Sequence, residues 1–197
     1  AKQSKRHKRT YMHRQTQEPE TNLLDRQFHA AAPNEKWVSD ITFIPTREGW
    51  LFLAIVLDLF SRAIVGWAMH HRPNGQLVRD ALAMAIQSRE QPCNTLVHSD
   101  QGSQYTSELI QSLLGDQHSQ VSMSGVGNCY DNAPMESFFG RLKTEYALSP
   151  LATRAEARLI IFEHIEVWYN RQRLHSSLGY LSPAAFEQHY YETNSVR

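Results

Sequence analysis

Residues 37–44 read WVSDITFI, an alternation of side chains that is typical of a β-strand. The turn signal at 45–49 follows, and the nearly continuous apolar run at 50–57 then predicts a strand covered on both faces. A second turn at 58–62 leads to a third predicted strand at 63–69. Because both connections are short, we predict that these three strands are adjacent and antiparallel.

Helices and short strands alternate in the middle of the chain. Amphipathic helices are predicted at 76–87 and around 109–114, and short strands at 95–100 and 121–124. A helical crossover normally places the next strand parallel to its predecessor. The element order therefore predicts an α/β fold, a mixed five-stranded sheet with helices on both faces.

The length and composition are those of one globular domain with appendages. We expect a basic N-terminal arm and linker at 1–30, a core at 31–150, and a C-terminal helical extension packed on the core at 151–197. No apolar run is long enough to cross a bilayer. Cys93 and Cys129 show neither a metal-ligand nor a disulfide pattern, which indicates a reducing cytosol.

The net charge of zero hides an uneven distribution. Residues 1–14 hold six Lys or Arg and no acid, which leaves 14 basic and 20 acidic residues in the remainder. A basic arm on a mildly acidic body predicts a nucleic-acid contact, with Lys5, Arg6, Lys8 and Arg9 as candidates. The alternatives are a solubilising tail and the end of a linker to another domain.

Residues 131–139 read DNAPMESFF and have the features of a helix start. Pro134 suits the first turn, where its missing N–H has no partner to lose. Beyond it, Asn132, Glu136 and Lys143 recur at four and seven residues, so they share one stripe of the helix. Such a stripe is either an ordinary solvated face or one wall of an active site.

Three acids occupy positions from which they could converge. Asp40 sits inside the first strand, Asp100 closes a later strand, and Glu136 lies in the first turn of a helix. Each has an ordinary interpretation, as a solvent-facing residue, a turn residue and a helix-dipole partner respectively. Together they would repel one another unless a cation were present. Mg²⁺ is the natural partner, and three acids can hold two such ions about 3.5–4 Å apart for displacement at phosphorus.

Several longer segments carry a family resemblance. They are WVSDIT (37–42), LDLFSR (57–62), HSDQGSQY (98–105), GNCYDNAPMESFF (127–139), YNR (169–171) and HSSLGY (175–180). With these segments the chain resembles the retroviral-integrase-like transposases of bacterial insertion sequences, in the DDE superfamily class assembled from two overlapping reading frames. The 35 residues between Asp100 and Glu136 also fit that family's acid triad.

The resemblance implies an RNase H-like fold with Asp40, Asp100 and Glu136 as the metal-binding catalytic triad, holding two Mg²⁺ or Mn²⁺ ions. It implies cleavage of a phosphodiester at the ends of the element and transfer of the freed 3′-OH to another DNA strand. The implied partners are double-stranded DNA, further copies of the chain and an upstream helix-turn-helix segment. The implied location is the bacterial cytoplasm at the nucleoid, with no membrane contact.

Further residues are predicted around the triad. Lys143, Asn132, Arg171 and Arg173 are expected to contact DNA, against the alternatives of a solvated lysine, a helix cap and a contact between subunits. The chain departs from many relatives at Gly140, one turn after Glu136, where they place a lysine.

The same relatives often have a basic residue where this chain has Val126. Asp58 and Arg62 are predicted to form a turn and its ion pair, and His98 is predicted to belong to the scaffold. Two other functions stay open at this point. They are a metal-dependent nuclease that cuts without joining and a non-enzymatic DNA-binding remnant.

Overall fold

The structure is a computed structural model that describes residues 21–125, 129–145 and 153–194. Its strands are β1 (Lys36–Thr46), β2 (Gly49–Asp58), β3 (Ile64–His70), β4 (Leu96–Ser99) and β5 (Gln120–Met123). Its α-helices are α1 (Gly75–Ser88), α2 (Glu108–Gly115), α3 (Ala133–Glu145), α4 (Arg154–Phe162) and α5 (Pro183–Asn194). The 3₁₀-helix η1 (Cys129–Asn132) precedes α3, the π-helix η2 (Glu163–Tyr169) extends α4, and the 3₁₀-helix η3 (Ser176–Leu178) precedes α5.

The five strands form one mixed sheet in the order β3-β2-β1-β4-β5. The first three strands are antiparallel neighbours, as their short connections predict, while β4 pairs parallel with β1 and β5 pairs parallel with β4. The predicted mixed α/β sheet is confirmed. The pairing of β1 with β4 is the step that matters for the site, because it joins strands from distant parts of the chain.

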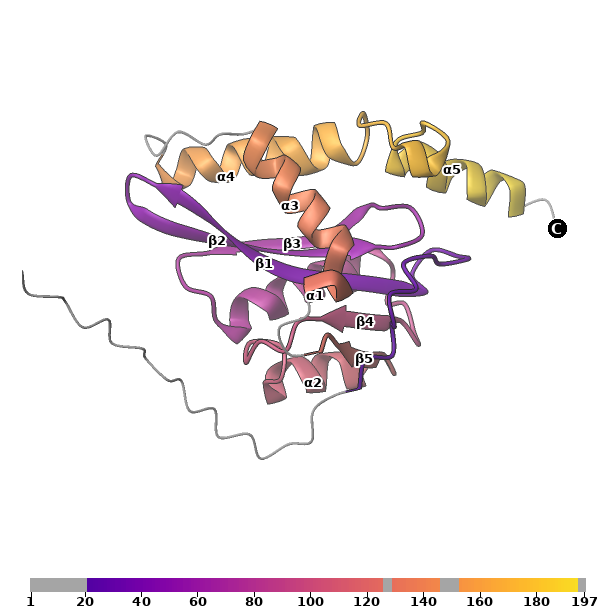
Figure 1. The fold of residues 1–197 in the computed structure, drawn as a ribbon, viewed down its shortest axis with the longest axis horizontal. Coiled ribbons are helices and arrows are strands. Elements are labelled where there is room, and N and C mark those ends of the chain that lie inside the picture. The colour runs from indigo at the N-terminus through magenta and orange to yellow at the C-terminus, as the bar shows by residue number, and fades with distance from the viewer. Residues whose placement is uncertain (1–20, 126–128, 146–152, 195–197) are drawn as a thin grey trace, which may run out of the picture.

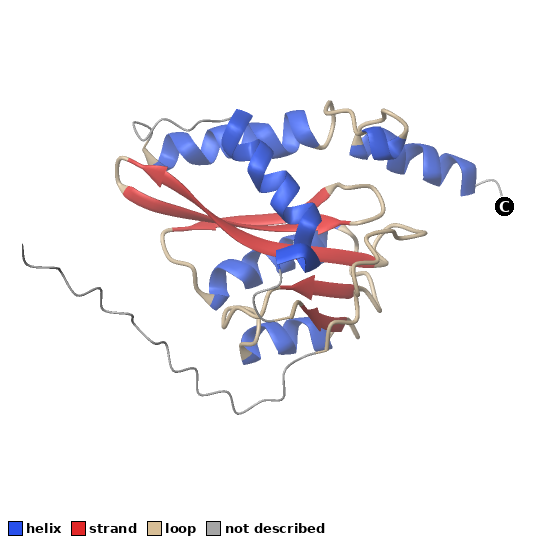
Figure 2. Cartoon of the chain, in the orientation of Figure 1, coloured by secondary structure: helices blue, strands red, loops and turns tan. Residues whose placement is uncertain are grey.

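Helices cover both faces of the sheet, and each face has its own buried apolar cluster. In one cluster, α3, α4 and η2 pack on strands β1, β2 and β3. In the other, α1 and α2 pack on side chains of the opposite face of the sheet. Figures 1 and 2 show α3 crossing in front of the sheet while α1 lies behind it. Burial on both faces explains why β2 reads as a nearly continuous apolar run.

Gly66 sets the distance between β3 and α1. A Cβ atom at this position would lie 2.2 Å from the backbone oxygen of Ala81 and 2.6 Å from the backbone nitrogen of Ala85. Only a glycine therefore allows the helix to approach the strand this closely.

The segment at 21–30, predicted to be part of the arm and linker, packs against the sheet. Leu24 and Ala30 are buried in the cluster beneath α3. The backbone N–H groups of Leu23 and Leu24 donate to Ser122 Oγ at 2.9 and 3.1 Å. Residues 21–30 therefore pack on the same apolar cluster as the strands that follow them, and the predicted division of the chain stays a prediction.

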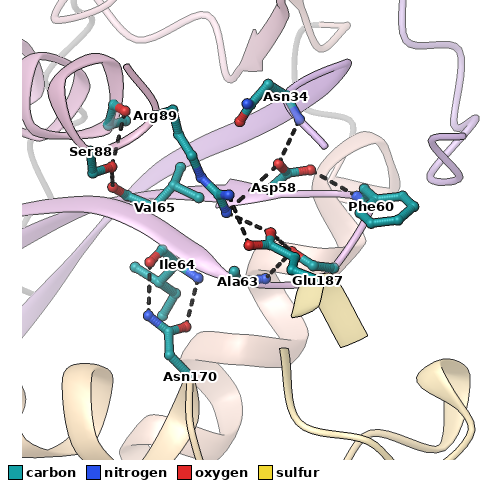
Figure 3. A network of polar contacts seen from close by, with 12 residues as sticks. Asn34, Asp58, Phe60, Ala63, Ile64, Val65, Ser88, Arg89, Asn170 and Glu187 are labelled. Carbon is teal, nitrogen blue, oxygen red and sulfur yellow. Dashed lines mark hydrogen bonds and ion pairs between the residues drawn. The ribbon is translucent and has the colours of Figure 1, made fainter. Parts of the chain in front are cut away.

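The C-terminal extension is attached to the outer strand β3 and its neighbours (Figure 3). The Asn170 side chain exchanges two hydrogen bonds of 2.9 Å with the backbone of Ile64, as a neighbouring strand would. Glu187 of α5 accepts two hydrogen bonds from the Arg89 guanidinium, at 2.8 and 2.6 Å. Thr153 and Glu156 form a capping box at the start of α4.

Asp58 is not paired with Arg62 as predicted. Its buried carboxylate accepts from the backbone N–H groups of Asn34 and Phe60 at 2.8 and 2.9 Å and lies 4.0 Å from Arg89 (Figure 3). The Arg62 guanidinium instead donates to the backbone oxygen of Phe28 at 3.3 Å. The prediction was wrong because the short turn folds Asp58 inward, toward the end of α1.

None of the helices within the described ranges combines the length and the apolar character needed to cross a membrane.

Candidate active site

Asp40 and Asp100 stand at matching positions of neighbouring parallel strands. The pairing of β1 with β4 places Trp37 opposite Val97 and Val38 opposite His98, a constant offset of 60 residues. Asp40 and Asp100 keep the same offset two residues further along. The two acids therefore lie near the point where β4 ends, between the interior strands of the sheet, and both line one cavity.

The carboxyl group of Asp40 is half-buried and electrostatically coupled to the other two acids. Burial is the main cause that raises the pKa of Asp40 from 3.8 to about 7. A 2.7 Å hydrogen bond from the Ile41 N–H lowers this pKa, the charges of Asp100 and Glu136 raise it, and Lys143 lowers it. The structure thus brings all three predicted acids, and the predicted lysine, into one electrostatic neighbourhood.

A cavity of about 220 Å³ opens beside the two aspartates, with Tyr105 in its wall. The buried Tyr105 hydroxyl lies 3.0 Å from Ser39 Oγ, directly beside Asp40 in the chain, and burial raises the pKa of Tyr105 well above its usual value. Asp100 itself accepts from the Gly102 N–H at 3.1 Å. A Cβ atom at Gly102 would lie 2.9 Å from Asp100 Oδ1, so a larger residue there would displace the carboxylate.

Glu136 is carried by the first turn of α3, which the buried side of that helix fixes to the sheet. Met135, Phe138, Phe139 and Leu142 all lie in the cluster with β1 and β2. Glu136 stays exposed on the other side of the helix. The apolar residues that flank the glutamate in the sequence are therefore what holds it opposite the strand-borne aspartates.

Asn132 is buried rather than presented to solvent. Its side chain is 6% exposed, and its amide donates to the backbone oxygen of Ser39 at 3.4 Å. This hydrogen bond links the end of η1 to β1, and the predicted DNA contact of Asn132 stays a prediction. The sequence pattern treated Asn132 as part of the same helical stripe as Glu136, but Asn132 lies in η1 and is buried, while Glu136 on α3 is exposed.

Lys143 remains at the exposed end of the same stripe. Its Nζ lies 4.9 Å from the centre of the Phe43 ring, a cation–π contact that orients the side chain along β1. From there its charge lowers the pKa of Asp40. Lys143 is thus placed beside the acids, where its contact with DNA stays a prediction.

Asp131, in the 3₁₀-helix η1, fixes the start of the helical segment that carries Glu136. Its carboxylate accepts from Arg26 Nε at 2.9 Å, from Asn22 Nδ2 at 3.1 Å and from the Gly125 N–H at 3.2 Å. The bond from Arg26 is the main cause that lowers the pKa of Asp131. No local pattern pointed to Arg26, since it lies more than a hundred residues away.

His98 belongs to the scaffold, as predicted. Its ring nitrogens lie 2.8 Å from Ser122 Oγ and 3.1 Å from Ser124 Oγ, and these contacts join β4 to β5. Burial lowers the pKa of His98, which favours the neutral ring.

The chemistry of the three acids suits a hard divalent cation, because they offer only carboxylate oxygens. A bound cation would also stabilise the charged carboxylate of Asp40 against the burial and the repulsion that raise its pKa. Across the described ranges, however, no three His, Cys, Asp or Glu side chains are already close enough together to hold a metal ion. The acids share a neighbourhood in this structure without sharing a coordination shell.

The other predicted DNA contacts are not brought to the acids. Arg171 is exposed just after η2, and Arg173 lies over the rings of Trp168 and Tyr169 at 5.4 and 5.5 Å. Arg173 lines a different cavity, one that none of the three acids lines. Val126 lies outside the described residues, and so do the residues of the N-terminal arm, Lys5, Arg6, Lys8 and Arg9.

Comparison with known sequences identifies related proteins. An integrase core domain model matches residues 30–129, and a second integrase core domain model matches residues 117–183. The transposase for insertion sequence element IS904 of Lactococcus lactis is 49% identical over 169 residues, which cover 85% of this chain and 67% of that protein. Transposase InsF for insertion sequence IS3A of Escherichia coli K12 is 48% identical over 167 residues, and the chain spans only 58% of its length.

Solved structures share the fold at lower identity. A chain of the simian T-cell lymphotropic virus intasome, solved with the PP2A regulatory subunit B56 gamma, superposes with a TM-score of 0.67 at 18% identity, over 89% of this chain and 60% of that one. The HTLV-2 integrase catalytic core domain, solved with magnesium, gives a TM-score of 0.58 at 15% identity, over 80% and 99%. The predicted RNase H-like architecture, shared with retroviral integrase cores, is therefore confirmed.

Proposed function

We propose that this chain, which belongs to the integrase core domain family, cuts and joins DNA as the catalytic core of an insertion-sequence transposase. Its relatives at 48–49% identity are transposases, and the matched region covers most of this chain. The chain spans 67% and 58% of those two proteins, so the activity of a whole transposase is part of the proposal.

The observation that carries the proposal is the cavity that Asp40 and Asp100 line together. The charges of Asp100 and Glu136, which both raise the pKa of Asp40, support it. Asp40 lies on β1, Asp100 directly follows β4, and Glu136 lies in the first turn of α3. Ligands of open α/β folds commonly bind at such strand ends. We propose that these three residues hold Mg²⁺ or Mn²⁺, with two ions in the complete site. Bound metal would neutralise charge at the phosphoryl oxygens and make water or a DNA 3′-OH a better nucleophile.

The residues of the chain supply the positioning. Asp40, on the strand that pairs with β4, would help to hold the metal together with the other two acids. Tyr105 and Ser39 fill the space behind Asp40. Lys143, on the exposed end of the stripe, would contact a DNA phosphate beside the reacting one and so fix the scissile bond relative to the acids.

Partners and location follow from the family. We propose that several copies act together on paired DNA ends, and that an upstream helix-turn-helix segment supplies much of the sequence recognition. The basic arm, with Lys5, Arg6, Lys8 and Arg9, would add contacts to DNA phosphates. The place of action would be the bacterial cytoplasm, on nucleoid DNA.

A strand-transfer assay tests this function. The wild-type chain is incubated with labelled duplex carrying the ends of its insertion sequence, with Mg²⁺, with Mn²⁺ or with a chelator. We expect cut and joined products with either metal and none with the chelator. Glu136→Gln should abolish both products, whereas Glu108→Gln, in the exposed first turn of α2, should leave them unchanged.

Cut ends without joined product would favour a nuclease of the same fold. Unchanged activity of Glu136→Gln would overturn the assignment of the triad.

A further inference from the structure

Three arginines from distant parts of the chain converge on a second cavity, which we call the arginine cavity. It has a volume of about 480 Å³, and its walls include Arg62 after β2, Ser137 and Arg141 of α3, and Arg173 and His175 after η2. Among the described residues that line it there is no Asp or Glu. The cavity is therefore a concentration of positive charge without a negative residue in its wall.

The three guanidinium groups are held in different ways. Arg62 stands at a left-handed backbone position (φ 62°), and its guanidinium is anchored on the Phe28 oxygen at 3.3 Å. Arg173 lies against two aromatic rings, which orient its planar group. Arg141 follows Ser137 by one turn of α3 and is exposed, so both face the same space.

The surroundings of the cavity confirm that these charges lie close together. Burial and, to a smaller extent, the charges of Arg173, Arg62 and Arg141 together lower the pKa of His175 to about 4, so the imidazole is neutral near pH 7. Its Nε2 atom is buried and has no hydrogen-bond partner among the described residues. Burial raises the pKa of Tyr169 to about 12, while the same three arginines act in the opposite direction.

We propose that the arginine cavity binds a phosphate group of the DNA backbone at a distance from the bond that is cut. The proposal rests on the function proposed above. Guanidinium groups match phosphate oxygens in geometry and charge, and the Ser137 hydroxyl and the neutral His175 ring can add hydrogen bonds. DNA supplies such groups densely, with one charge per about 1.7 Å of duplex.

The position of the cavity on α3 suits this role. Arg141 follows Glu136 by five residues, which is about 140° around a helix. One side of α3 therefore faces the acids, and the other side faces the arginine cavity. A DNA molecule that crosses α3 would meet the reacting site on one side and a fixed phosphate anchor on the other, which would set its direction across the sheet.

Salt-dependent binding of a fluorescent DNA duplex tests the proposal. The first variant is Arg141→Gln, because this exposed side chain is not needed for folding; Arg62→Gln is the second. The matched control is Arg158→Gln, which removes an exposed arginine of α4 outside the cavity. Melting temperatures confirm that each variant is folded.

We expect the slope of log K against log salt to fall in magnitude by about 0.9 for Arg141→Gln, because one phosphate contact is lost. Over a tenfold rise in salt, the wild-type chain should then lose about eightfold more affinity than the variant. Arg158→Gln should keep the wild-type slope.

Equal slopes for Arg141→Gln, Arg62→Gln and Arg158→Gln would overturn the proposal while leaving the proposed function intact, provided that the wild-type chain still cuts DNA. Loss of self-association with an unchanged slope would also overturn it, and would make the cavity a contact between copies. Failure of the triad test with a reduced slope in Arg141→Gln would instead overturn the catalytic assignment and support the phosphate site.

Discussion

Asn132 donates its side-chain amide to the backbone oxygen of Ser39, the residue that precedes Asp40. This 3.4 Å contact joins the helix that carries Glu136 to the strand that carries Asp40. The relative position of Asp40 and Glu136 therefore depends in part on the buried side chain of Asn132.

Replacing Asn132 should impair catalysis more than stability. We expect Asn132→Ala to lower the strand-transfer rate by about 10- to 100-fold, because small displacements of reacting groups are costly. Asn74→Ala is the control, since it removes the amide that caps α1 and should cost about 1 kcal/mol of stability without slowing the reaction. The strand-transfer rate and urea unfolding are measured for both variants. Equal strand-transfer rates for Asn132→Ala and Asn74→Ala would contradict the role of the Asn132–Ser39 contact in positioning the acids.

The contact between Glu187 and Arg89 should stabilise the attachment of α5. Both side chains are mostly buried, with 14% and 13% exposed, so loss of one charge leaves the other poorly compensated. We expect Glu187→Gln to lower the free energy of unfolding by about 1–3 kcal/mol. The exposed Glu192→Gln on the same helix should change it little, and equal effects of the two variants in urea unfolding would refute this contribution.

Two histidines, the buried His164 and the half-buried His175, should make the fold sensitive to acid. Burial is the main cause that lowers the pKa of His164 and of His175 from 6.5 to about 4. The unfolded chain therefore binds more protons than the folded chain between these values, so their stabilisation is complete above pH 6.5 and is lost toward pH 4. The urea midpoint should fall across this window, and less steeply in His175→Gln than in the exposed control His189→Gln.

Gly140 should accept a lysine that extends the stripe of Glu136 and Lys143. A Cβ atom there would meet nothing within 4 Å, and the same is true of Gly115 in α2. We expect Gly140→Lys to steepen the salt dependence of DNA binding by about 0.9, through one more phosphate contact. It should also stabilise α3 by somewhat less than about 1 kcal/mol. Gly115→Lys adds the same charge far from the acids, so equal slopes for the two variants would show that the position of the charge does not matter.

The sheet and the acids could be predicted because their signals are local. Alternation in β1, the apolar run of β2 and the short turns between strands each reflect which side chains face the core. The spacing in α3 likewise separated the exposed Glu136 from the buried Phe138 and Phe139. Such periodicities follow directly from helix and strand geometry.

The contacts that could not be predicted are those between distant segments. Arg26 reaches Asp131 across 105 residues, and Arg89 reaches Glu187 across 98. The burial of Asn132 depends on how closely α3 approaches β1. The arginine cavity depends on helices and loops from three parts of the chain, which come together only when the chain folds. Spacing along the chain carries no information about these encounters.

The π-helix η2 keeps the buried side chains of the C-terminal helical segment on the side that faces the sheet. Ala157, Ile161, Ile165 and Tyr169 are all buried in one cluster, although side chains four residues apart in an α-helix move by about 40° per step. The wider winding of a π-helix takes up this excess, so the buried row stays aligned with the sheet. Asn170, directly after η2, then faces Ile64 and bonds to its backbone. The winding of η2 therefore sets where the chain continues after residue 170.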